Sequence, residues 1–332
     1  MPNRARADRW PSQSSIRTEG FLEEWLVSIV HSVRPRTWHR YAEYVHLHIV
    51  PSLGPVPLDV LSPRDIQGLY TEKIAAGLSP RSVLHLHRVL HRALAQAQRW
   101  GVVSDNAADL VDPPRPDTRE MQALSPDEAR RFLAAAAGDR FEALYTLAIT
   151  TGMRQGELLG LRWRDVSLEE RSVRVTGSLQ YVPGRGLRVS APKTARSRRH
   201  VLLSEFGAEV LARHHKQQEH ERAVARDWDD NDLVFPNRLG RPMYATNLLD
   251  RSFTALLERA RLPRVRFHDL RHTAATLLLG QGVHPKVVSE MLGHTNTSIT
   301  LDLYSHATPT MQREAAGAFD RLLLGPRTNV TR

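Results

Sequence analysis

The sequence predicts a mainly α-helical protein of two domains, with one small antiparallel β-sheet in the second domain. Signals for helix starts recur along most of the chain. Residues 112–123 are rich in proline and charge and show no apolar periodicity, so we expect them to link the two domains. Residues 172–204 contain short runs that are typical of strands separated by turns. The length of 332 residues suits about two domains.

Charge and composition limit the classes of partner and chemistry that suit this chain. The net charge of +10 favours a polyanionic partner such as nucleic acid. Only four of the 46 basic residues are lysines, and a lysine, unlike an arginine, can give up a proton. The absence of cysteine excludes disulfides and thiol catalysis. The chain has no apolar run of membrane length and no signal core at its start, so we expect a cytoplasmic, nucleoid-associated protein.

The first domain is expected to span residues 19–111 as four helices, after a basic tail without fixed structure at residues 1–18. Two of the helices start at Ser62-Pro63 and Ser79-Pro80, where a capping hydroxyl precedes a proline at the first helical position. These starts place the last two helices of the domain.

The last of these helices, residues 80–100, has two distinct faces. Its apolar stripe consists of Val83, Leu86, Leu90, Leu94 and Ala97. Its opposite, basic face carries Arg81, His85, Arg88, Arg92 and Arg99. Such a face is either merely solvated or contacts DNA, and the pattern alone leaves both open.

The second domain, residues 124–332, is expected to open with a capping box at Ser125, because Glu128 stands three residues later. Two or three helices to about residue 165 precede strands at 172–178, 186–191 and 198–204. Helices then continue to a last one near 309–324. The apolar face of that helix is Met311, Ala315, Ala318 and Leu322. This face either docks on a neighbouring subunit or packs on its own domain.

A basic patch accompanies the strands. Residues 185–199 contain no acidic residue. They hold Arg185, Arg188, Lys193, Arg196, Arg198 and Arg199. A patch of this kind on a hairpin is well suited to contacting DNA phosphates.

Reactive polar residues concentrate in four separate segments. They are Arg154 with Glu157 one turn later, Lys193 in a loop between strands, His268 with Arg271, and His294 with Tyr304 ten residues later. Each alone has an ordinary structural explanation. His268 and His272 are spaced for a metal site, but Asp269 stands where metalloproteases carry glutamate, and the charge of Arg271 opposes a dication.

Together these segments resemble the tyrosine recombinase, or phage integrase, family. The family pattern T-G-x-R-x-x-E-L-x-x-L-x-W-x-D matches residues 151–165, and H-x-L-R-H matches residues 268–272. L-G-H matches residues 292–294, and the tyrosine follows at the family's spacing. The match is strong over 124–310, whereas residues 19–111 resemble the family in length and layout only. The resemblance implies a helical core-binding domain followed by an α+β catalytic domain.

The resemblance and the chemistry of a phosphodiester imply a role for each residue. Arg154 and Arg271 would clamp the non-bridging oxygens, because a guanidinium gives two parallel bonds to phosphate. Tyr304 would be the nucleophile, and His268 would accept its proton. Lys193 would give a proton to the leaving 5′-oxygen, and His294 would donate a hydrogen bond to the phosphate. Glu157 would support Arg154. No metal or other cofactor is implied.

The family resemblance also implies partners. They are double-stranded DNA at attachment or core sites, three further copies in a tetramer that works through a Holliday junction, and an accessory directionality or DNA-bending factor. A type IB topoisomerase uses the same residue set, but the length of residues 19–111 and the spacing to Tyr304 favour a recombinase. The complete residue set disfavours a non-catalytic DNA-binding regulator. About 18 residues precede the first predicted helix, too few for a separate arm-binding domain.

Overall fold

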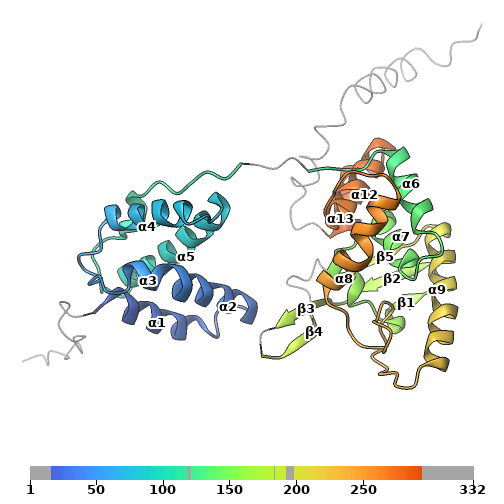
Figure 1. Cartoon of the computed structure of the whole chain (residues 1–332), viewed down its shortest axis with the longest axis horizontal. Helices are drawn as coiled ribbons and strands as arrows, with labels where there is room; N and C mark the ends of the chain where they lie inside the picture. The colour runs from blue at the N-terminus through green and yellow to red at the C-terminus, as the bar shows by residue number, and fades with distance from the viewer. Residues whose placement is uncertain (1–15, 118–120, 183, 192–197, 294–332) are drawn as a thin grey trace, which may run out of the picture. The chain divides into compact units, whose positions relative to one another are not determined.

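The computed structural model describes residues 16–117, 121–182, 184–191 and 198–293 (Figure 1). The chain divides into two compact units, residues 1–119 and 120–332, and the division falls inside the predicted linker. Both units are mainly helical and the second holds short antiparallel strands, which confirms the predicted fold class. Within the described ranges, no helix is long and apolar enough to cross a membrane.

Four helical rods make up the described part of the N-terminal unit. They are α1 (Thr18–Ile29), α2 (Pro35–Tyr44) continued by the π-helix η2 (Val45–Ile49) and by α3 (Val50–Leu53), α4 (Pro63–Ala75), and α5 (Pro80–Arg99), which the 3₁₀ turn η3 (Ala107–Leu110) follows. Both predicted caps are present, because the Ser62 hydroxyl accepts a hydrogen bond from Asp65 N–H and the Ser79 hydroxyl accepts one from Ser82 N–H.

The second rod runs through Pro51 without breaking. Proline lacks the N–H that would bond the carbonyl four residues earlier, and its ring crowds that carbonyl. The wide π turn at Val45–Ile49 lies just before Pro51 and makes room for its ring while the helix continues. Val45, Ile49 and Leu53 consequently all stay in the core of the unit.

Helix α5 has the two faces that its sequence predicts. The five residues of its apolar stripe are buried, and the five of its basic face are exposed. Arg92 lies over the ring of Tyr41, 5.5 Å from its centroid, and donates a 3.1 Å hydrogen bond to the Tyr41 hydroxyl. Tyr41 in turn stacks on the buried Trp25. The charge of Arg92 is therefore held on a rigid aromatic support.

The residues at the end of the predicted N-terminal tail, 16–18, have fixed contacts. Thr18 is buried at the start of α1, where its hydroxyl donates to the carbonyl oxygen of Val56 at 2.9 Å, and Arg17 forms a β-bridge with Pro57. The expectation that residues 16–18 lack fixed structure is wrong, because these contacts tie them to the loop after α3. Residues 1–15 lie outside the described residues.

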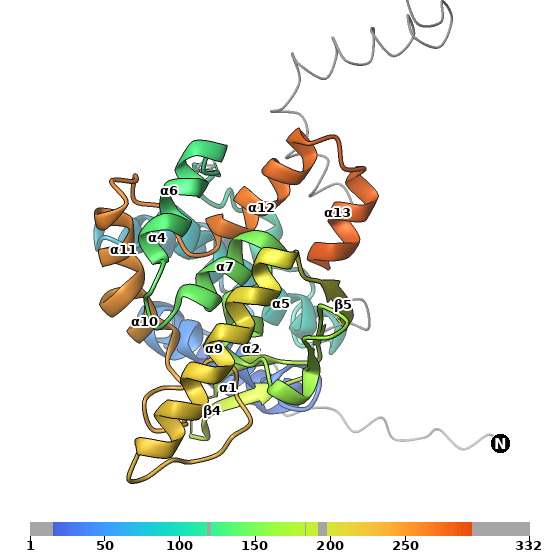
Figure 2. The same ribbon diagram turned by 90° about the vertical axis from the view of Figure 1, so that its right-hand side faces the viewer.

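The C-terminal unit is built around α7. It opens with α6 (Pro126–Ala136), α7 (Glu142–Thr151) and α8 (Gln155–Leu159), and the predicted capping box of Ser125 and Glu128 is formed. Almost every residue of α7 is buried, because α6, α9 (Glu205–Val224) and α12 (Asp269–Gly280) cover it (Figure 2). A helix that is apolar on all sides needs such a central position.

Two small antiparallel sheets follow α8 and the 3₁₀ turn η4 (Trp163–Asp165). One has the order β1-β2-β5, from β1 (Val166–Ser167), β2 (Ser172–Val175) and β5 (Arg199–Leu202). The other is a hairpin of β3 (Ser178–Val182) and β4 (Gly186–Ser190), which projects from the body of the unit (Figure 1). Arg199 pairs with Val175 in the first sheet.

The strand expected at 172–178 is divided between the two sheets. The chain leaves β2 at Val175 and enters the hairpin at Ser178, passing through Gly177. A Cβ at Gly177 would stand 2.6 Å from the Cγ1 atom of Val189. The close approach of β4 therefore sets the point where the strand breaks.

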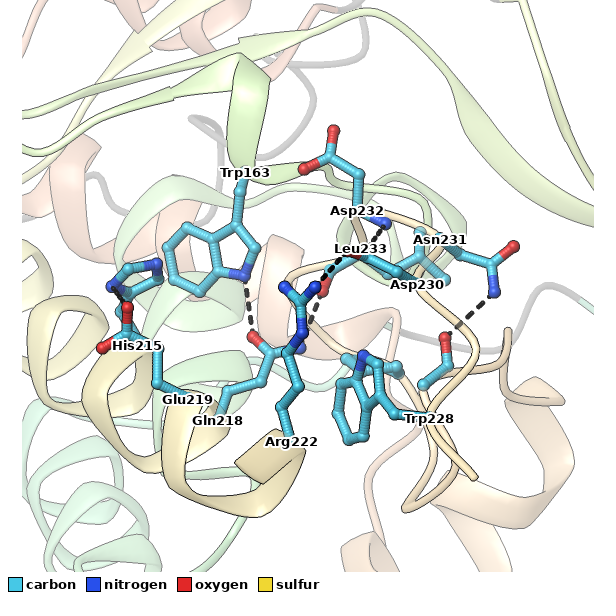
Figure 3. Close-up of a pocket in the computed structure, with 12 residues that line it drawn as sticks. Trp163, His215, Gln218, Glu219, Arg222, Trp228, Asp230, Asn231, Asp232 and Leu233 are labelled. Carbon is cyan, nitrogen blue, oxygen red and sulfur yellow. Dashed lines mark hydrogen bonds and ion pairs between the residues drawn. The ribbon is translucent and has the colours of Figure 1, made fainter. Parts of the chain in front are cut away.

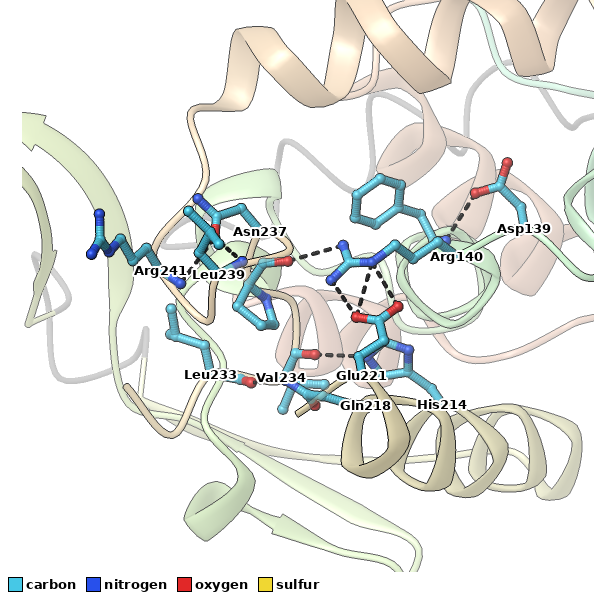
Figure 4. Close-up of polar contacts among 12 residues, drawn as sticks. Asp139, Arg140, His214, Gln218, Glu221, Leu233, Val234, Asn237, Leu239 and Arg241 are labelled. Carbon is cyan, nitrogen blue, oxygen red and sulfur yellow. Dashed lines mark hydrogen bonds and ion pairs between the residues drawn. The ribbon is translucent and has the colours of Figure 1, made fainter. Parts of the chain in front are cut away.

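Helix α9 is fastened to the chain that follows it. Arg140 donates three hydrogen bonds to the Glu221 carboxylate, from Nε to Oε1 at 2.9 Å and to Oε2 at 3.2 Å and from Nη2 to Oε2 at 2.8 Å, and it donates to the carbonyl oxygen of Pro236 (Figure 4). The ring of His214 contacts the carbonyl oxygen of Val234 at 2.7 Å. These bonds join α9 to Arg140, just before α7, and to residues 234–236.

A cavity of about 210 Å³ lies beside this fastening, between α9 and residues 228–240 (Figure 3). Trp163 closes one side, and its indole N–H donates to the side chain of Gln218, which itself donates to the carbonyl oxygen of Leu233. None of the candidate catalytic residues that the structure describes lines this cavity. Its polar groups bond one another, so it belongs to the scaffold.

The other described helices of this unit follow residue 244. They are α10 (Ala245–Leu248), the π-helix η6 (Leu249–Phe253), α11 (Thr254–Arg259), α12 (Asp269–Gly280) and α13 (Pro285–Leu292). Helix α12 begins just after His268 and carries Arg271. Helix α13 ends at Leu292, two residues before His294 in the sequence.

Candidate active site

Gly152 is the point where three segments of the site meet. It ends α7 in the left-handed conformation, with φ +63°. A Cβ at this position would overlap the side chain of Leu292 and lie 3.7 Å from the Cγ atom of Arg271. Glycine therefore allows the segment that carries Arg154 to approach α12 and the end of α13.

Arg271 is held ready for an anion. It is buried in α12, and its Nη1 donates to the carbonyl oxygen of Gly152 at 2.8 Å. Its Nη2 is also buried and has no hydrogen-bond partner among the described residues. Burial, followed by the charge of Arg154, lowers the pKa of Arg271 to about 9, so it remains a cation at neutral pH. A buried, unfilled charged donor is costly unless a ligand fills it.

Arg154 stands at the start of α8, paired with Glu157. Its Nη1 donates to Glu157 Oε1 at 2.8 Å, its backbone N–H donates to Glu157 Oε2 at 3.0 Å, and its Nη2 reaches the carbonyl oxygen of Gly293 at 3.4 Å. Unlike Arg271, the Arg154 side chain is 38% exposed. It is therefore both oriented and accessible to a substrate.

Glu157 is a buried carboxylate between two arginines. Burial by itself would raise the pKa of Glu157, but hydrogen bonds and charge from Arg199 and then Arg154 outweigh it and lower the pKa. Glu157 is therefore ionised at neutral pH. One carboxylate among Arg154, Arg199 and Arg271 leaves an excess of positive charge where a phosphate would bind.

Arg199 does not lie on the exposed basic patch where the sequence analysis places it. Its side chain is only 6% exposed and binds Glu157 through Nη2 at 2.9 Å and Nη1 at 3.3 Å. In β5, residues alternate between buried and exposed, and Arg199 shares the inner face with Val201. The expected DNA contact by Arg199 is therefore replaced by an internal one. That alternation is the sequence signal that could have revealed it.

The other basic residues of the hairpin region keep their expected exposure where they are described. Arg185, Arg188 and Arg198 are exposed. Lys193 and Arg196 lie outside the described residues, and so do His294, Tyr304 and the predicted helix 309–324.

His268 immediately precedes α12, with its ring 5.1 Å from that of His272. Burial is the main cause that lowers the pKa of His268 to about 4, and the charges of His272, Arg271 and Arg154 add to it. The imidazole is therefore neutral at neutral pH and has a nitrogen free to accept a proton.

This neutrality can be measured by NMR titration. The Cε1–Hε1 signal of His268, assigned by its loss in His268→Gln, should still report a neutral ring at pH 6 and titrate near 4. Between about pH 4 and pH 6.5 the unfolded chain, in which the His pKa is 6.5, binds more protons at this residue than the folded protein does. The stability that His268 contributes is thus present above pH 6.5 and lost as the pH falls toward 4. A midpoint near 6.5 in the folded protein would contradict this assignment.

The chain belongs to the phage integrase family, whose model ("Phage integrase family") matches residues 122–311. It is a tyrosine recombinase, an enzyme of DNA recombination. Residues 19–74 match the "Phage integrase, N-terminal SAM-like domain". The two matches fall on the two units of the fold.

Two curated relatives cover most of the chain. A tyrosine recombinase XerC-like protein of Caldanaerobacter subterraneus subsp. tengcongensis is 32% identical over an alignment of 323 residues, and the alignment covers 91% of this chain and 82% of the relative. An integrase of Streptomyces ambofaciens is 31% identical over an alignment of 315 residues, which covers 90% of this chain and 80% of the relative.

Solved structures share the fold. The Tn1549 transposon integrase in complex with a circular intermediate DNA has a TM-score of 0.78 at 22% identity, covering 92% of this chain and 100% of that one. A lambda integrase tetramer bound to a Holliday junction has a TM-score of 0.62 at 17% identity, covering 86% of this chain and 80% of that one.

Proposed function

We propose that this recombinase is site-specific and cuts DNA through a 3′-phosphotyrosyl intermediate on Tyr304. The observation that supports this most is that Arg271 bonds the carbonyl oxygen of Gly152, two residues before Arg154, feels the charge of Arg154, and has a donor left unfilled among the described residues. Two guanidiniums that act on one site suit the two non-bridging oxygens of a phosphodiester.

The proposed reaction moves one proton at each end of the phosphate. The Tyr304 phenol oxygen attacks phosphorus while its proton passes to His268, which is neutral and able to accept it. The bond from phosphorus to the 5′-oxygen breaks, and Lys193 gives that oxygen a proton. His294 donates a hydrogen bond to the phosphate. The phosphotyrosyl bond keeps the energy of the phosphodiester, so rejoining requires no cofactor.

The proposed assembly is a tetramer that exchanges strands through a Holliday junction between attachment or core sites. It is supported by the likeness to a lambda integrase whose structure is a tetramer on such a junction. We assign residues 19–111 to binding the core DNA, residues 112–123 to the linker and residues 124–332 to catalysis. An accessory directionality or DNA-bending factor, and association with the nucleoid, belong to the same proposal.

A covalent-adduct assay tests the function. A bound duplex is first selected from random DNA with the full-length protein and then nicked near the cleavage site, so that the short 5′-hydroxyl strand diffuses away. We expect a protein–DNA band that survives denaturation, with the label on the strand whose 3′ end is attached. A type IB topoisomerase would also give this band but would relax plasmids lacking the selected site. No adduct on any bound duplex would contradict the proposal.

The basic face of α5 is the proposed DNA-contacting surface of the N-terminal unit. Removing one phosphate contact makes the log–log salt dependence of affinity shallower by about 0.9. Arg88→Gln should show this change in a salt titration of Kd. The matched control is Arg64→Gln, an exposed arginine at the start of α4 that removes the same charge from another part of the unit. Equal changes for both variants would show that α5 is not the contacting face.

A further inference from the structure

Arg199 joins three parts of the active site that are far apart in the sequence. From β5 it reaches α8 through Glu157, and its Nε donates to the carbonyl oxygen of Met291 at 2.7 Å, at the end of α13. Gly293, the residue before His294, packs so closely on Arg199 that an added Cβ would lie 3.1 Å from its Cδ and Nη1 atoms. Arg199 therefore contacts the two segments that lead to Arg154 and to His294.

The geometry at Glu157 shows how this contact reaches Arg154. The two carboxylate oxygens of Glu157 are each shared, Oε1 between the guanidiniums of Arg154 and Arg199, and Oε2 between Arg199 and the Arg154 backbone N–H. Without Arg199, the carboxylate keeps only its two bonds from Arg154, and one of these comes from the guanidinium whose position Glu157 has to fix. The position of the Arg154 guanidinium would then be less well defined.

We propose that Arg199 is a positioning residue for strand cleavage, which acts by fixing Glu157 against the end of α13 so that the Arg154 guanidinium is aligned with the phosphate. The inference rests on the proposed function. It differs from a DNA-binding role, because the Arg199 side chain is buried against protein atoms. Arg199 does not touch the reacting phosphate in this assignment.

The role requires the forked guanidinium, not only its charge. Lysine at this position would keep one cation, but it offers a point charge that cannot bind both Glu157 and the carbonyl of Met291 in the same geometry. Small losses of alignment at a reacting centre lower rates by about 10- to 100-fold. Arg199→Lys should therefore reduce the cleavage rate by at least about 10-fold at saturating protein, with a DNA Kd close to that of the wild type.

The experiment compares single-turnover cleavage of two nicked duplexes by full-length protein. One has an ordinary scissile phosphate, and the other has a methylphosphonate, in which a methyl group replaces one charged oxygen. The neutral phosphonate needs less charge stabilisation, so Arg154→Ala should be less impaired on it. If Arg199 acts through Arg154, the deficit of Arg199→Lys relative to wild type should shrink on the same methylphosphonate isomer. A general structural defect would give the same deficit on both substrates, and that result would overturn the proposal.

Two further variants guard against misfolding. Arg199→Met with Glu157→Gln removes both buried charges, so neither remains unpaired, and this double variant should fold while cleaving slowly. Its deficit should be smaller than the product of the two single deficits, because both act through Arg154. The matched control is Arg174→Met, which changes an exposed arginine of β2 beside the strand pair of Arg199 and should cleave at the wild-type rate.

The outcomes separate the two proposals. Failure of the wild type to cleave either duplex would overturn the proposed function and this inference with it. Cleavage by wild type together with full activity of Arg199→Lys would overturn this inference alone.

Discussion

Full-length protein carrying Tyr304→Phe is expected to bind its selected DNA with an affinity near that of the wild type and to form no covalent adduct. The substitution removes only the phenol oxygen, which is the proposed nucleophile, and retains the aromatic ring. Loss of the nucleophile cannot be compensated by the arginine clamp, since Arg154 and Arg271 stabilise charge but do not attack phosphorus. The nicked-duplex adduct assay, run beside a gel-shift titration, measures both quantities.

Tyr181 and Tyr244 supply the control for this variant. Both are exposed tyrosines whose rings lie 6.0 Å apart beside the projecting hairpin, outside the proposed catalytic set. Tyr181→Phe and Tyr244→Phe should still form the adduct. A denaturation-resistant complex formed by Tyr304→Phe would mean that another residue attacks the phosphate.

Arg154→Lys is expected to lower the single-turnover cleavage rate by about 100-fold or more, although the charge is kept. The lysine ammonium can still pair with Glu157, so the variant should fold. It cannot, however, bind Glu157 and present two parallel donors to phosphate, as the guanidinium does from its 38% exposed position. The rate at saturating protein isolates this effect from any change in DNA affinity.

Arg174→Lys is the control for the conservative change. It makes the same replacement on the exposed face of β2 and should cleave as the wild type does. A rate for Arg154→Lys within about threefold of wild type would be too small for a lost transition-state donor and would remove Arg154 from the clamp.

Local signals in the sequence predicted the helices well because each signal acts within a few residues. Ser62, Ser79 and Ser125 all cap the helices that they were expected to start. The buried and exposed faces of α5 follow directly from the helical repeat. The division of the strand at Gly177 could not be predicted in this way, because its cause is the side chain of Val189, which approaches from another strand.

The difference between local signals and contacts with distant residues also explains which parts of the site were predicted. Arg154, Glu157 and Arg271 were recognisable from their motifs, and the structure brings them together at Gly152 and Gly293. Their roles, and those of Lys193, His294 and Tyr304, stay predictions. Arg198 and Arg199 look alike in the sequence, yet one is exposed and the other is buried. The alternation along β5 groups Arg199 with Val201, but which of the two faces lies inward depends on how β5 packs beside β2, whose paired residues are more than twenty positions away.

The unfilled donor of Arg271 has a consequence for how this enzyme has evolved. A buried N–H without a partner in the described structure, next to a second cation, makes the unliganded protein less stable than an apolar residue of similar volume would. Selection for thermal stability alone would therefore tend to remove Arg271, whereas selection for recombination retains it. Stabilised descendants of this chain should accumulate their substitutions elsewhere and keep Arg271.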